Sequence, residues 1–383
     1  MTNADEAIVR RRRLALIAPT ALSIINFRGP LVRELITRGV DVFALAPDYD
    51  EATRAAVVAL GARPIDSSLS RATVNPLRDL RDFFRLRKQL RELRADISFA
   101  FTIKPVIYGT LAASLAGVPS RYAMIEGAGH LFTDDGAHSL RRGLVRAITV
   151  VLYKLGLGQA KRIFILNNDD IALFTGSRMT SLRKVVHIDG IGIDLDNYHF
   201  TPPVLDPICF ILVARLLKEK GVYDYIEAAQ KVRAVCPAAG FILVGSIDRN
   251  PTSVTDQEVE TWKEKGLVEV TGHVADVRPW LKKASVFVLP SYREGMPRST
   301  QEAMAMGRPV ITTNVPGCRD TVVEGVNGFI VPVRDSTALA AAMLTFVHNP
   351  ALLAEMGMKS RTMAEKRFDV HRINSQILEV IGC

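Results

Sequence analysis

The sequence predicts an α/β protein built from two doubly wound parallel-sheet domains that face each other across a cleft. Short apolar runs of strand length alternate with helical patterns along the whole chain, which is typical of parallel sheets covered by helices. Breaker residues at Thr201–Pro203 and Asp206–Pro207 interrupt this alternation, and the pattern then restarts. A chain of 383 residues is long enough for two domains, each with its own core.

The first half contains six apolar runs that predict buried strands, with helical patterns between them. The strands are expected at Leu14–Ala18, Val40–Leu45, Ile97–Phe101, Tyr122–Ile125, Ile163–Leu166 and Val185–Ile188. The helices are expected at Pro30–Arg38, Asn75–Arg94, Pro105–Ala116 and Leu140–Leu155. Residues 1–200 are therefore expected to form a Rossmann-like domain.

The second half repeats the alternation over residues 207–365, which we expect to form a second Rossmann-like domain. Its strands are expected at Cys209–Val213, Phe241–Val244, Leu267–Val270, Val286–Leu289, Val310–Thr312 and Phe329–Val331. Residues 366–383 are expected to form a helix that packs back towards the first domain. In such sheets ligands bind beyond the carboxyl ends of the strands, so a binding site is expected in the cleft.

Positive charge is concentrated in the first half. Residues 1–200 contain 28 Lys/Arg and 20 Asp/Glu, giving +8, whereas residues 201–383 contain 21 and 20, giving +1. This asymmetry indicates an anionic partner, which could be nucleic acid, an anionic membrane surface or a phosphorylated substrate. No nucleic-acid recognition motif is present, so no nucleic-acid partner is expected. Residues 75–94 combine apolar and basic side chains, which suits either a helix at an anionic membrane or an ordinary packed helix.

Cysteine usage and the apolar segments indicate the compartment. The four cysteines are scattered, without a CxxC pair or a histidine at ligand spacing, which argues against a structural metal or a disulfide framework. The N-terminus is basic and lacks the apolar region of a secretory signal. No apolar stretch reaches the roughly 20 residues that cross a bilayer. We therefore expect a cytoplasmic protein.

A pair of cations follows the first strand of the second half. The strand is expected to end in Arg215, a short loop carries Lys220, and Gly221 opens the next helix. Two cations at a point where a strand end faces a helix N-terminus favour the binding of phosphate.

A second motif, residues 290–304, places two glutamates around a helix start. Glu294 lies in the loop after a strand, and Gly295 would let the backbone approach a ligand. Pro297 suits the first turn of a helix, whose free N–H groups would face an anion. Glu302 lies on the same helix, and its two acceptor oxygens suit the vicinal diol of a ribose.

Two more strands of the second half end in glycine, at Gly245 and Gly272. A base or a phosphate could approach the backbone at these positions. Both glycines are therefore candidate donor contacts.

Together these motifs closely resemble the retaining glycosyltransferases of family 4, also described as glycosyl transferases group 1. The resemblance rests on the Glu294–Glu302 spacing, the Arg215 and Lys220 pair, the run 302–310 and the glycine-bracketed turn Gly325–Phe329, and it covers residues 207–365. It implies a GT-B fold, a nucleotide-sugar donor bound by the second domain, and no metal or other cofactor.

The resemblance also implies roles for individual residues. Arg215 and Lys220 would neutralise the donor diphosphate, Glu294 would contact the transferred sugar, and Glu302 would bind the ribose. The remaining donor contacts would come from Gly295, Met296, Pro297, Gly245, Gly272 and Gly29.

Three segments of the first half, residues 26–31, 101–105 and 126–132, resemble bacterial enzymes that build surface polysaccharides or glycan precursors on polyprenyl diphosphate. By this resemblance, Gly29 would stand at a helix start that faces the donor, and Lys104 would contact the acceptor or the sugar. Many family members have a donor-contacting histidine in the loop that Glu126 occupies here. Glu126, His130 or neither of them takes over that role. The catalytic candidates are Glu294, Arg215, Lys220 and Glu126.

The expected activity is the retaining transfer of a hexosyl or N-acetylhexosaminyl group from a UDP-sugar. The acceptor would be a glycan or a polyprenyl-diphosphate-linked glycan, held by residues 1–200 at the inner face of the plasma membrane. Two alternatives remain open: a sugar-nucleotide epimerase, which can share the two-domain fold, and a non-catalytic nucleotide-sugar-binding subunit of a glycan assembly complex. A dehydrogenase is disfavoured because no GxGxxG follows the first strand.

Overall fold

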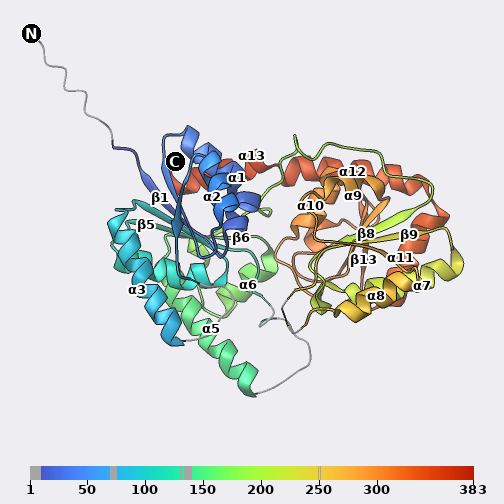
Figure 1. Ribbon diagram of the computed structural model, residues 1–383, viewed down its shortest axis with the longest axis horizontal. Helices are drawn as coiled ribbons and strands as arrows, with labels where there is room; N and C mark the ends of the chain where they lie inside the picture. Colours follow the sequence, from blue (N-terminus) through green and yellow to red (C-terminus); the bar gives the residue numbers. More distant parts are fainter. Residues whose placement is uncertain (1–9, 70–75, 130–131, 133–139, 249, 251) are drawn as a thin grey trace, which may run out of the picture.

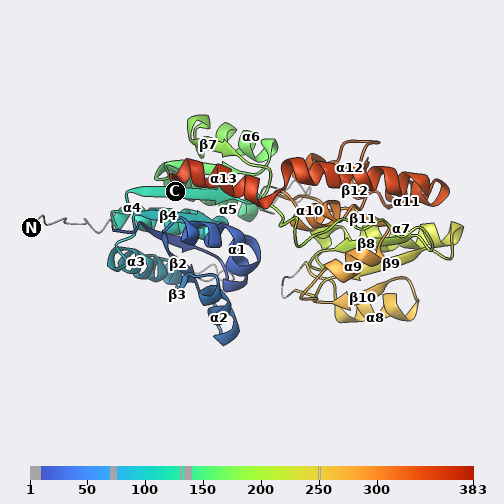
Figure 2. The same ribbon diagram turned by 90° about the horizontal axis from the view of Figure 1, so that it is seen from above.

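The computed structural model describes residues 10–69, 76–129, 132, 140–248, 250 and 252–383. The described residues form two parallel sheets, each lying between layers of helices (Figure 1 and Figure 2). The predicted α/β class and the pair of doubly wound sheets are therefore confirmed.

The N-terminal sheet has the strand order β3-β2-β1-β4-β5-β6-β7, with parallel pairing throughout. Its strands are β1 (Arg13–Ile17), β2 (Asp41–Ala46), β3 (Arg63–Asp66), β4 (Ile97–Phe101), β5 (Ser120–Ile125), β6 (Arg162–Ile165) and β7 (Val185–His187). The strand order reverses its direction between β1 and β4, which is the point where such sheets open to ligands. The edge strand β3 was not predicted, because its sequence Arg-Pro-Ile-Asp contains no apolar run.

Helices cover both faces of this sheet. They are α1 (Ala21–Thr37), α2 (Glu51–Ala59), α3 (Pro76–Glu92), η1 (Pro105–Gly109), α4 (Thr110–Leu115), α5 (Leu140–Gly158) and α6 (Asn168–Gly176). The helix predicted at Pro105–Ala116 is divided into the π-helical turn η1 and the α-helix α4. Single π-turns of this kind are frequent at functional sites.

The start of α1 differs from the prediction. We predicted a helix start at Pro30, but α1 begins at Ala21, where Thr20 caps the Ser23 N–H at 3.2 Å. Pro30 lies inside the helix and has no N–H to donate to the carbonyl of Asn26, four residues earlier. That carbonyl instead accepts a hydrogen bond of 2.6 Å from Arg298 of the C-terminal half. Pro30 therefore leaves open an acceptor that the other half uses.

The C-terminal sheet has the strand order β10-β9-β8-β11-β12-β13, again with parallel pairs. Its strands are β8 (Cys209–Val213), β9 (Gly240–Val244), β10 (Glu269–Gly272), β11 (Val286–Leu289), β12 (Val310–Thr313) and β13 (Gly328–Val331). Its helices, with the final helix of the chain, are α7 (Val222–Val235), α8 (Asp256–Glu264), α9 (Arg278–Lys283), α10 (Arg298–Ala305), α11 (Ser336–His348), α12 (Ala351–Arg367) and α13 (Val370–Ile381). β8 ends two residues before Arg215, so this side chain lies in the following loop and not at the strand end.

Two segments connect the halves. The first follows Thr201, whose hydroxyl accepts a hydrogen bond of 2.5 Å from the fully buried Arg308. The second is α13, which returns from the C-terminal half and packs against α1 (Figure 1 and Figure 2). At its end, Arg38 donates to the carbonyl of Cys383 at 2.8 Å. The two halves are thus held together at the linker and at the C-terminus.

Within the described ranges, no single helix is long and apolar enough to cross a membrane. α11 and α12 meet the length and composition criteria when they are taken together, but they are bent by 109° at the break between them.

Candidate functional site

The two halves meet where the loop after β5 contacts the loop after β11. A Cβ atom added at Gly295 would lie 1.7 Å from the carbonyl oxygen of Glu126, and one added at Gly127 would lie 3.3 Å from the Cα of Gly295. Backbone therefore lies directly against backbone, and position 295 has no room for a side chain. Asn167, which follows β6, donates to the Gly295 carbonyl at 2.6 Å. The predicted site segments around Glu126 and Glu294 are brought together by this contact.

Glu294 forms an ion pair with Lys220. The Nζ of Lys220 lies 2.5 Å from the Oε1 of Glu294, and the hydroxyl of Ser291 donates to the same oxygen at 2.8 Å. Both side chains of the pair are largely buried. At the end of the Lys220 loop, Gly221 has a φ of 71°, and a Cβ there would lie 2.1 Å from the Pro290 carbonyl oxygen. Glycine is thus required for the cation loop to lie against the Glu294 loop.

Arg215, the other cation predicted for the donor site, pairs with Asp248 and not with Glu294. Its guanidinium pairs with Asp248 at 2.6 Å, and 47% of its side chain is exposed. An exposed ion pair of this kind contributes about 0–1 kcal/mol, so Arg215 can change partner at little cost. A phosphate at this edge would therefore compete readily with Asp248.

The two predicted glycines differ in what surrounds them. A Cβ at Gly245 would lie 1.8 Å from the carbonyl oxygen of Ala214, so glycine is required there by packing within the protein. Gly272 has a φ of 71° and no atom within 4 Å of an added Cβ, so only its backbone conformation favours glycine.

Glu302 is held on α10 by two polar partners. It accepts a hydrogen bond of 3.0 Å from the hydroxyl of Tyr198 and one of 2.8 Å from Arg298. Burial raises the pKa of the Tyr198 phenol, which therefore remains a donor at neutral pH. Because Arg298 also donates to the Asn26 carbonyl of α1, the position of Glu302 is tied to the N-terminal half.

The residues before α10 lie close to their predicted places. Pro297 immediately precedes the helix, and no side chain caps the N-terminus. Met296 is buried beside Gly190. The first amides of α10 thus begin directly after the Glu294 loop, which is the arrangement that suits an anion.

Arg28 is a site residue that sequence reasoning missed. Its guanidinium is buried, forms an ion pair with the carboxylate of Glu126 and lies 4.4 Å from the ring centre of Phe101. Burial lowers the pKa of Arg28, and the charge of Glu126 opposes this shift. In the sequence, Arg28 lies in the segment 26–31 that carries the resemblance, but nothing there shows that its side chain is buried against Glu126.

Polar groups at the start of α6 were also missed. Asp170 is fully buried and pairs with Arg293 of the C-terminal half, while Asp169 pairs with Arg319 at 2.7 Å. Burial raises the pKa of the Asp170 carboxyl, and Arg293 opposes the shift. These contacts fix the loop that carries Glu294 against the N-terminal half.

Thr102, at the end of β4, is a further residue without a sequence signal. It has a φ of 69°, a conformation that is strained for a β-branched side chain. Its hydroxyl is buried without a hydrogen-bond partner among the described residues. Strain and an unpaired polar group at a strand end are typical of functional sites.

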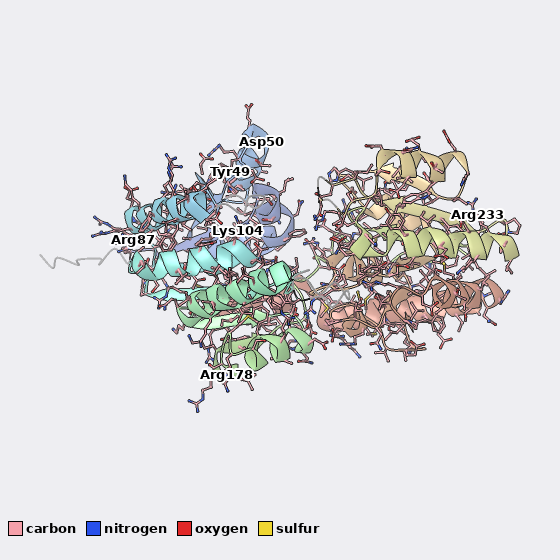
Figure 3. All side chains as sticks on the ribbon, turned by 90° about the horizontal axis from the view of Figure 1, so that it is seen from below. Tyr49, Asp50, Arg87, Lys104, Arg178 and Arg233 are labelled. Atoms are coloured by element: carbon pink, nitrogen blue, oxygen red, sulfur yellow. The ribbon has the colours of Figure 1, made fainter. Side chains whose placement is uncertain are left out.

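Gly29, Lys104 and His130 are the remaining predicted residues of the first half. The predicted position of Gly29 at a helix start is wrong: Gly29 lies in the interior of α1, where an added Cβ would meet Leu60 at 3.6 Å. Lys104 pairs with Asp79 of α3 at 3.0 Å and lies among the helices of the N-terminal half (Figure 3). His130 lies outside the described residues.

Sequence comparison places both halves in glycosyltransferase families. Residues 207–349 match the family described as glycosyl transferases group 1, and residues 27–186 match the glycosyl transferase 4-like domain. A Campylobacter jejuni protein named N,N'-diacetylbacillosaminyl-diphospho-undecaprenol alpha-1,3-N-acetylgalactosaminyltransferase is 29% identical, and the match covers 96% of this chain and 98% of that protein.

Two further comparisons agree. An Escherichia coli protein named UDP-Gal:alpha-D-GlcNAc-diphosphoundecaprenol alpha-1,3-galactosyltransferase is 25% identical, and the match covers 73% of each chain. The crystal structure of Anabaena HepE in complex with UDP and glucose superposes with a TM-score of 0.77 at 20% identity, covering 97% of this chain and all of that one. The GT-B fold expected from the sequence is therefore confirmed.

The backbone contact at Gly295 leads to a first prediction. Gly295→Ala should lower the free energy of unfolding by about 1–3 kcal/mol, because the new methyl group must displace the Glu126 carbonyl. The matched control is Gly176→Ala, at the end of α6, where an added Cβ has open space. Chemical denaturation of both variants tests this. Equal stability would show that the two loops are not pressed together.

Proposed function

We propose that this protein, which belongs to the family of glycosyl transferases group 1 and is a retaining glycosyltransferase, moves a sugar from a UDP-sugar to a polyprenyl-diphosphate-linked glycan in surface polysaccharide synthesis. The observation that carries the proposal is the cluster of Lys220, Glu294 and the start of α10 opposite Glu126. The names of the Campylobacter and Escherichia relatives, which both contain a diphospho-undecaprenol acceptor, support the acceptor class.

In this proposal residues 207–365 bind the donor. The diphosphate lies between the Lys220 loop and the N-terminus of α10, with Arg215 leaving Asp248 to join it. Glu302 accepts the ribose hydroxyls, and Glu294 orients the sugar. Departure of the nucleoside diphosphate develops negative charge. Once the donor is bound, the cations and the helix amides stabilise this charge without further reorganisation. The ion pair of Lys220 with Glu294 supports this assignment. Lys220 is the proposed phosphate ligand and Glu294 the proposed sugar ligand, so the ion pair fixes the two ligands relative to each other.

Residues 1–200 bind the acceptor in this proposal. Glu126 reaches the cleft from the loop after β5, and Arg28 holds its carboxylate in one orientation. An acceptor hydroxyl that attacks the anomeric carbon must approach from this side, because the donor occupies the other half. Attack from the face that the diphosphate leaves gives retention of configuration.

No metal ion takes part in the proposed mechanism. Lys220, Arg215 and the α10 amides supply positive charge at the place where a metal would otherwise stand. In the described part of the chain, no group of three or more His, Cys, Asp or Glu side chains could hold a metal ion.

In this proposal the lipid of the acceptor brings the protein to a membrane, and we propose α5 as the contact surface. Four apolar side chains spaced by four, three and four residues are each more than half exposed on this helix: Leu144, Ile148, Val151 and Leu155. This spacing forms a single stripe, with Lys154 beside it. An exposed apolar stripe with a cation beside it suits the surface of an anionic bilayer. We therefore propose peripheral attachment through the N-terminal half.

The donor site is tested by removing its charges singly. Lys220→Ala and Glu302→Ala should each weaken UDP-sugar binding by about 1–3 kcal/mol, because a charged hydrogen bond is lost. The controls are Lys263→Ala and Glu260→Ala, which break an exposed ion pair on α8. Calorimetric titration with a panel of UDP-sugars measures the affinities. Unchanged affinity in both site variants would refute the assignment.

Metal independence is tested by chelation. Transfer activity should persist in excess EDTA at a rate within about twofold of the untreated enzyme, because protein cations neutralise the leaving group. Loss of turnover that Mg²⁺ or Mn²⁺ restores would contradict the proposal.

Membrane attachment is tested with vesicles. Replacing Ile148 and Val151 by Gln should reduce co-sedimentation with anionic vesicles at least tenfold, and high salt should weaken binding of the wild type. The control makes the same replacement by Gln at Leu22 and Val58, two exposed apolar residues on α1 and α2, and should bind like the wild type. If both double variants bind like the wild type, or if neutral vesicles bind equally well, α5 is not a charge-assisted membrane surface.

A further inference from the structure

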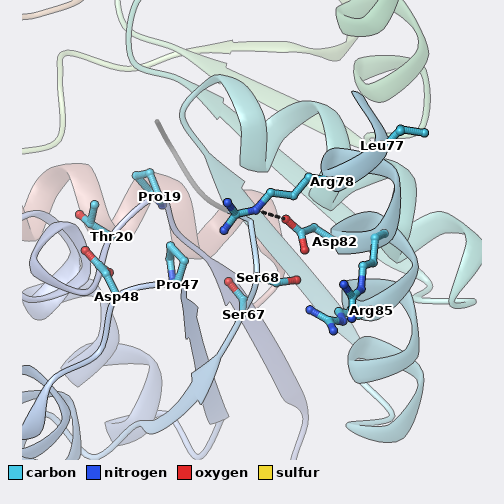
Figure 4. Close-up of a pocket in the computed structure, with 11 residues that line it drawn as sticks. Pro19, Thr20, Pro47, Asp48, Ser67, Ser68, Leu77, Arg78, Asp82 and Arg85 are labelled. Carbon is cyan, nitrogen blue, oxygen red and sulfur yellow. Dashed lines mark ion pairs between the residues drawn. The ribbon is translucent and has the colours of Figure 1, made fainter. Parts of the chain in front are cut away.

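A hollow of about 760 Å³ lies at the carboxyl edge of the N-terminal sheet. The loops after β1, β2 and β3 form one side of it, and α3 forms the other (Figure 4). Ligands of doubly wound sheets bind at this edge. None of the residues predicted from the sequence to contact the donor or the acceptor lines this hollow.

Three arginines of α3 line the hollow. Arg78, Arg81 and Arg85 are spaced by three and four residues, so they share one face of the helix. Arg78 pairs with the buried Asp82 at 3.9 Å. Arg81 and Arg85 are exposed and form no ion pair with any described residue. Like charges at this spacing repel each other, and an anion bound between them would remove the repulsion.

Two serines line the hollow opposite these arginines. Figure 4 shows Arg78 and Arg85 extending from α3 towards Ser67 and Ser68 at the end of β3. The hydroxyl oxygens of both serines are buried without a hydrogen-bond partner among the described residues, and Ser67 is 8% exposed. An unpaired buried hydroxyl is unfavourable, and a bound oxyanion would accept its hydrogen bond.

The carboxylates that line the hollow already have partners. Asp48 accepts a hydrogen bond of 2.7 Å from the Ala21 amide at the start of α1, and Asp82 pairs with Arg78. The hollow therefore presents two guanidinium groups and two hydroxyls that have no partner within the described part of the chain. Arg78 and Arg85 are seven residues apart, which corresponds to roughly 10 Å along the helix. This row is longer than one phosphate group and suits two linked phosphates.

We propose that this hollow binds the diphosphate of the lipid-linked acceptor. The inference rests on the proposed function, because it assigns the acceptor's charged group to this place. Ser67, Ser68, Arg81 and Arg85 donate to the phosphate oxygens, and Arg78 closes one end of the row.

The surroundings of the hollow suit both ends of such an acceptor. Leu77, at the rim of the hollow, is 81% exposed, and Leu80 and Phe84 continue an exposed apolar stripe along α3 that suits the lipid chain. On the other side, α3 is joined through Asp79 to Lys104 after β4. β4 lies between β1 and β5, so the glycan passes along the sheet edge from the hollow to the loop of Glu126.

A binding experiment tests the hollow independently of turnover. With the donor site saturated by UDP, inorganic pyrophosphate should bind the wild type and bind Arg81→Gln/Arg85→Gln at least tenfold more weakly. The matched control is Lys88→Gln/Arg91→Gln, which removes the same charge from the same helix away from the hollow and should bind like the wild type. Equal affinity in all three proteins, or an equal loss in both double variants, would overturn the proposal.

A kinetic experiment identifies the source of the diphosphate. In detergent without phospholipid, Arg81→Gln/Arg85→Gln should raise the KM for a short-chain polyprenyl-diphosphate sugar at least tenfold, with the KM for the donor unchanged. Ser67→Ala/Ser68→Ala should shift the acceptor KM in the same direction by a smaller factor.

An unchanged acceptor KM together with weaker vesicle binding would assign the arginines to phospholipid headgroups and overturn the proposal. Absence of transfer by the wild type to any acceptor would refute the proposed function, while the pyrophosphate titration would still decide whether the hollow is an anion site.

Discussion

Contact between two backbones sets the geometry of this protein's cleft. The Glu126 carbonyl occupies the place where a side chain at Gly295 would stand, so the loops after β5 and β11 can meet only because that residue is glycine. Asn167 and the paired acids at the start of α6 hold the contact from the N-terminal side. Glu294, the residue before the glycine, is consequently fixed opposite Glu126, and Lys220 is fixed by Glu294. The distance between the donor and acceptor halves therefore depends on this contact.

A second connection between the halves runs from α1 through Arg298 to Glu302. Pro30 leaves the Asn26 carbonyl unused within α1, Arg298 binds that carbonyl, and the same arginine holds Glu302. The proposed ribose ligand is thus positioned partly by a helix of the other half. Because α13 packs on α1 as well, the C-terminal residues support the same helix from its other side. A change of domain orientation would alter Glu302 and Glu294 together.

The sequence predicted most strands because buried parallel strands are continuous apolar runs, and the GT-B class followed from the residues around Glu294 and Glu302. The edge strand β3 was missed because it is short and polar. The start of α1 was misplaced because a proline inside a helix looks like one at its first turn. Arg28, Asn167 and the hollow beside α3 could not be predicted, because their partners are distant in sequence and meet only through the strand order. Ser67 and Ser68 could not be recognised as site residues from the sequence, because only the fold brings them opposite the arginines of α3.

The central claim is that the cleft transfers a sugar with retention to a diphosphate-linked acceptor. The most direct test incubates the enzyme with α-linked UDP-sugars and a polyprenyl-diphosphate-linked sugar, and determines the anomeric configuration of the product by NMR coupling constants. The account predicts an α-linked product and one UDP released for each sugar transferred. A β-linked product, or release of UDP with no transfer to any diphosphate-linked acceptor, would contradict it.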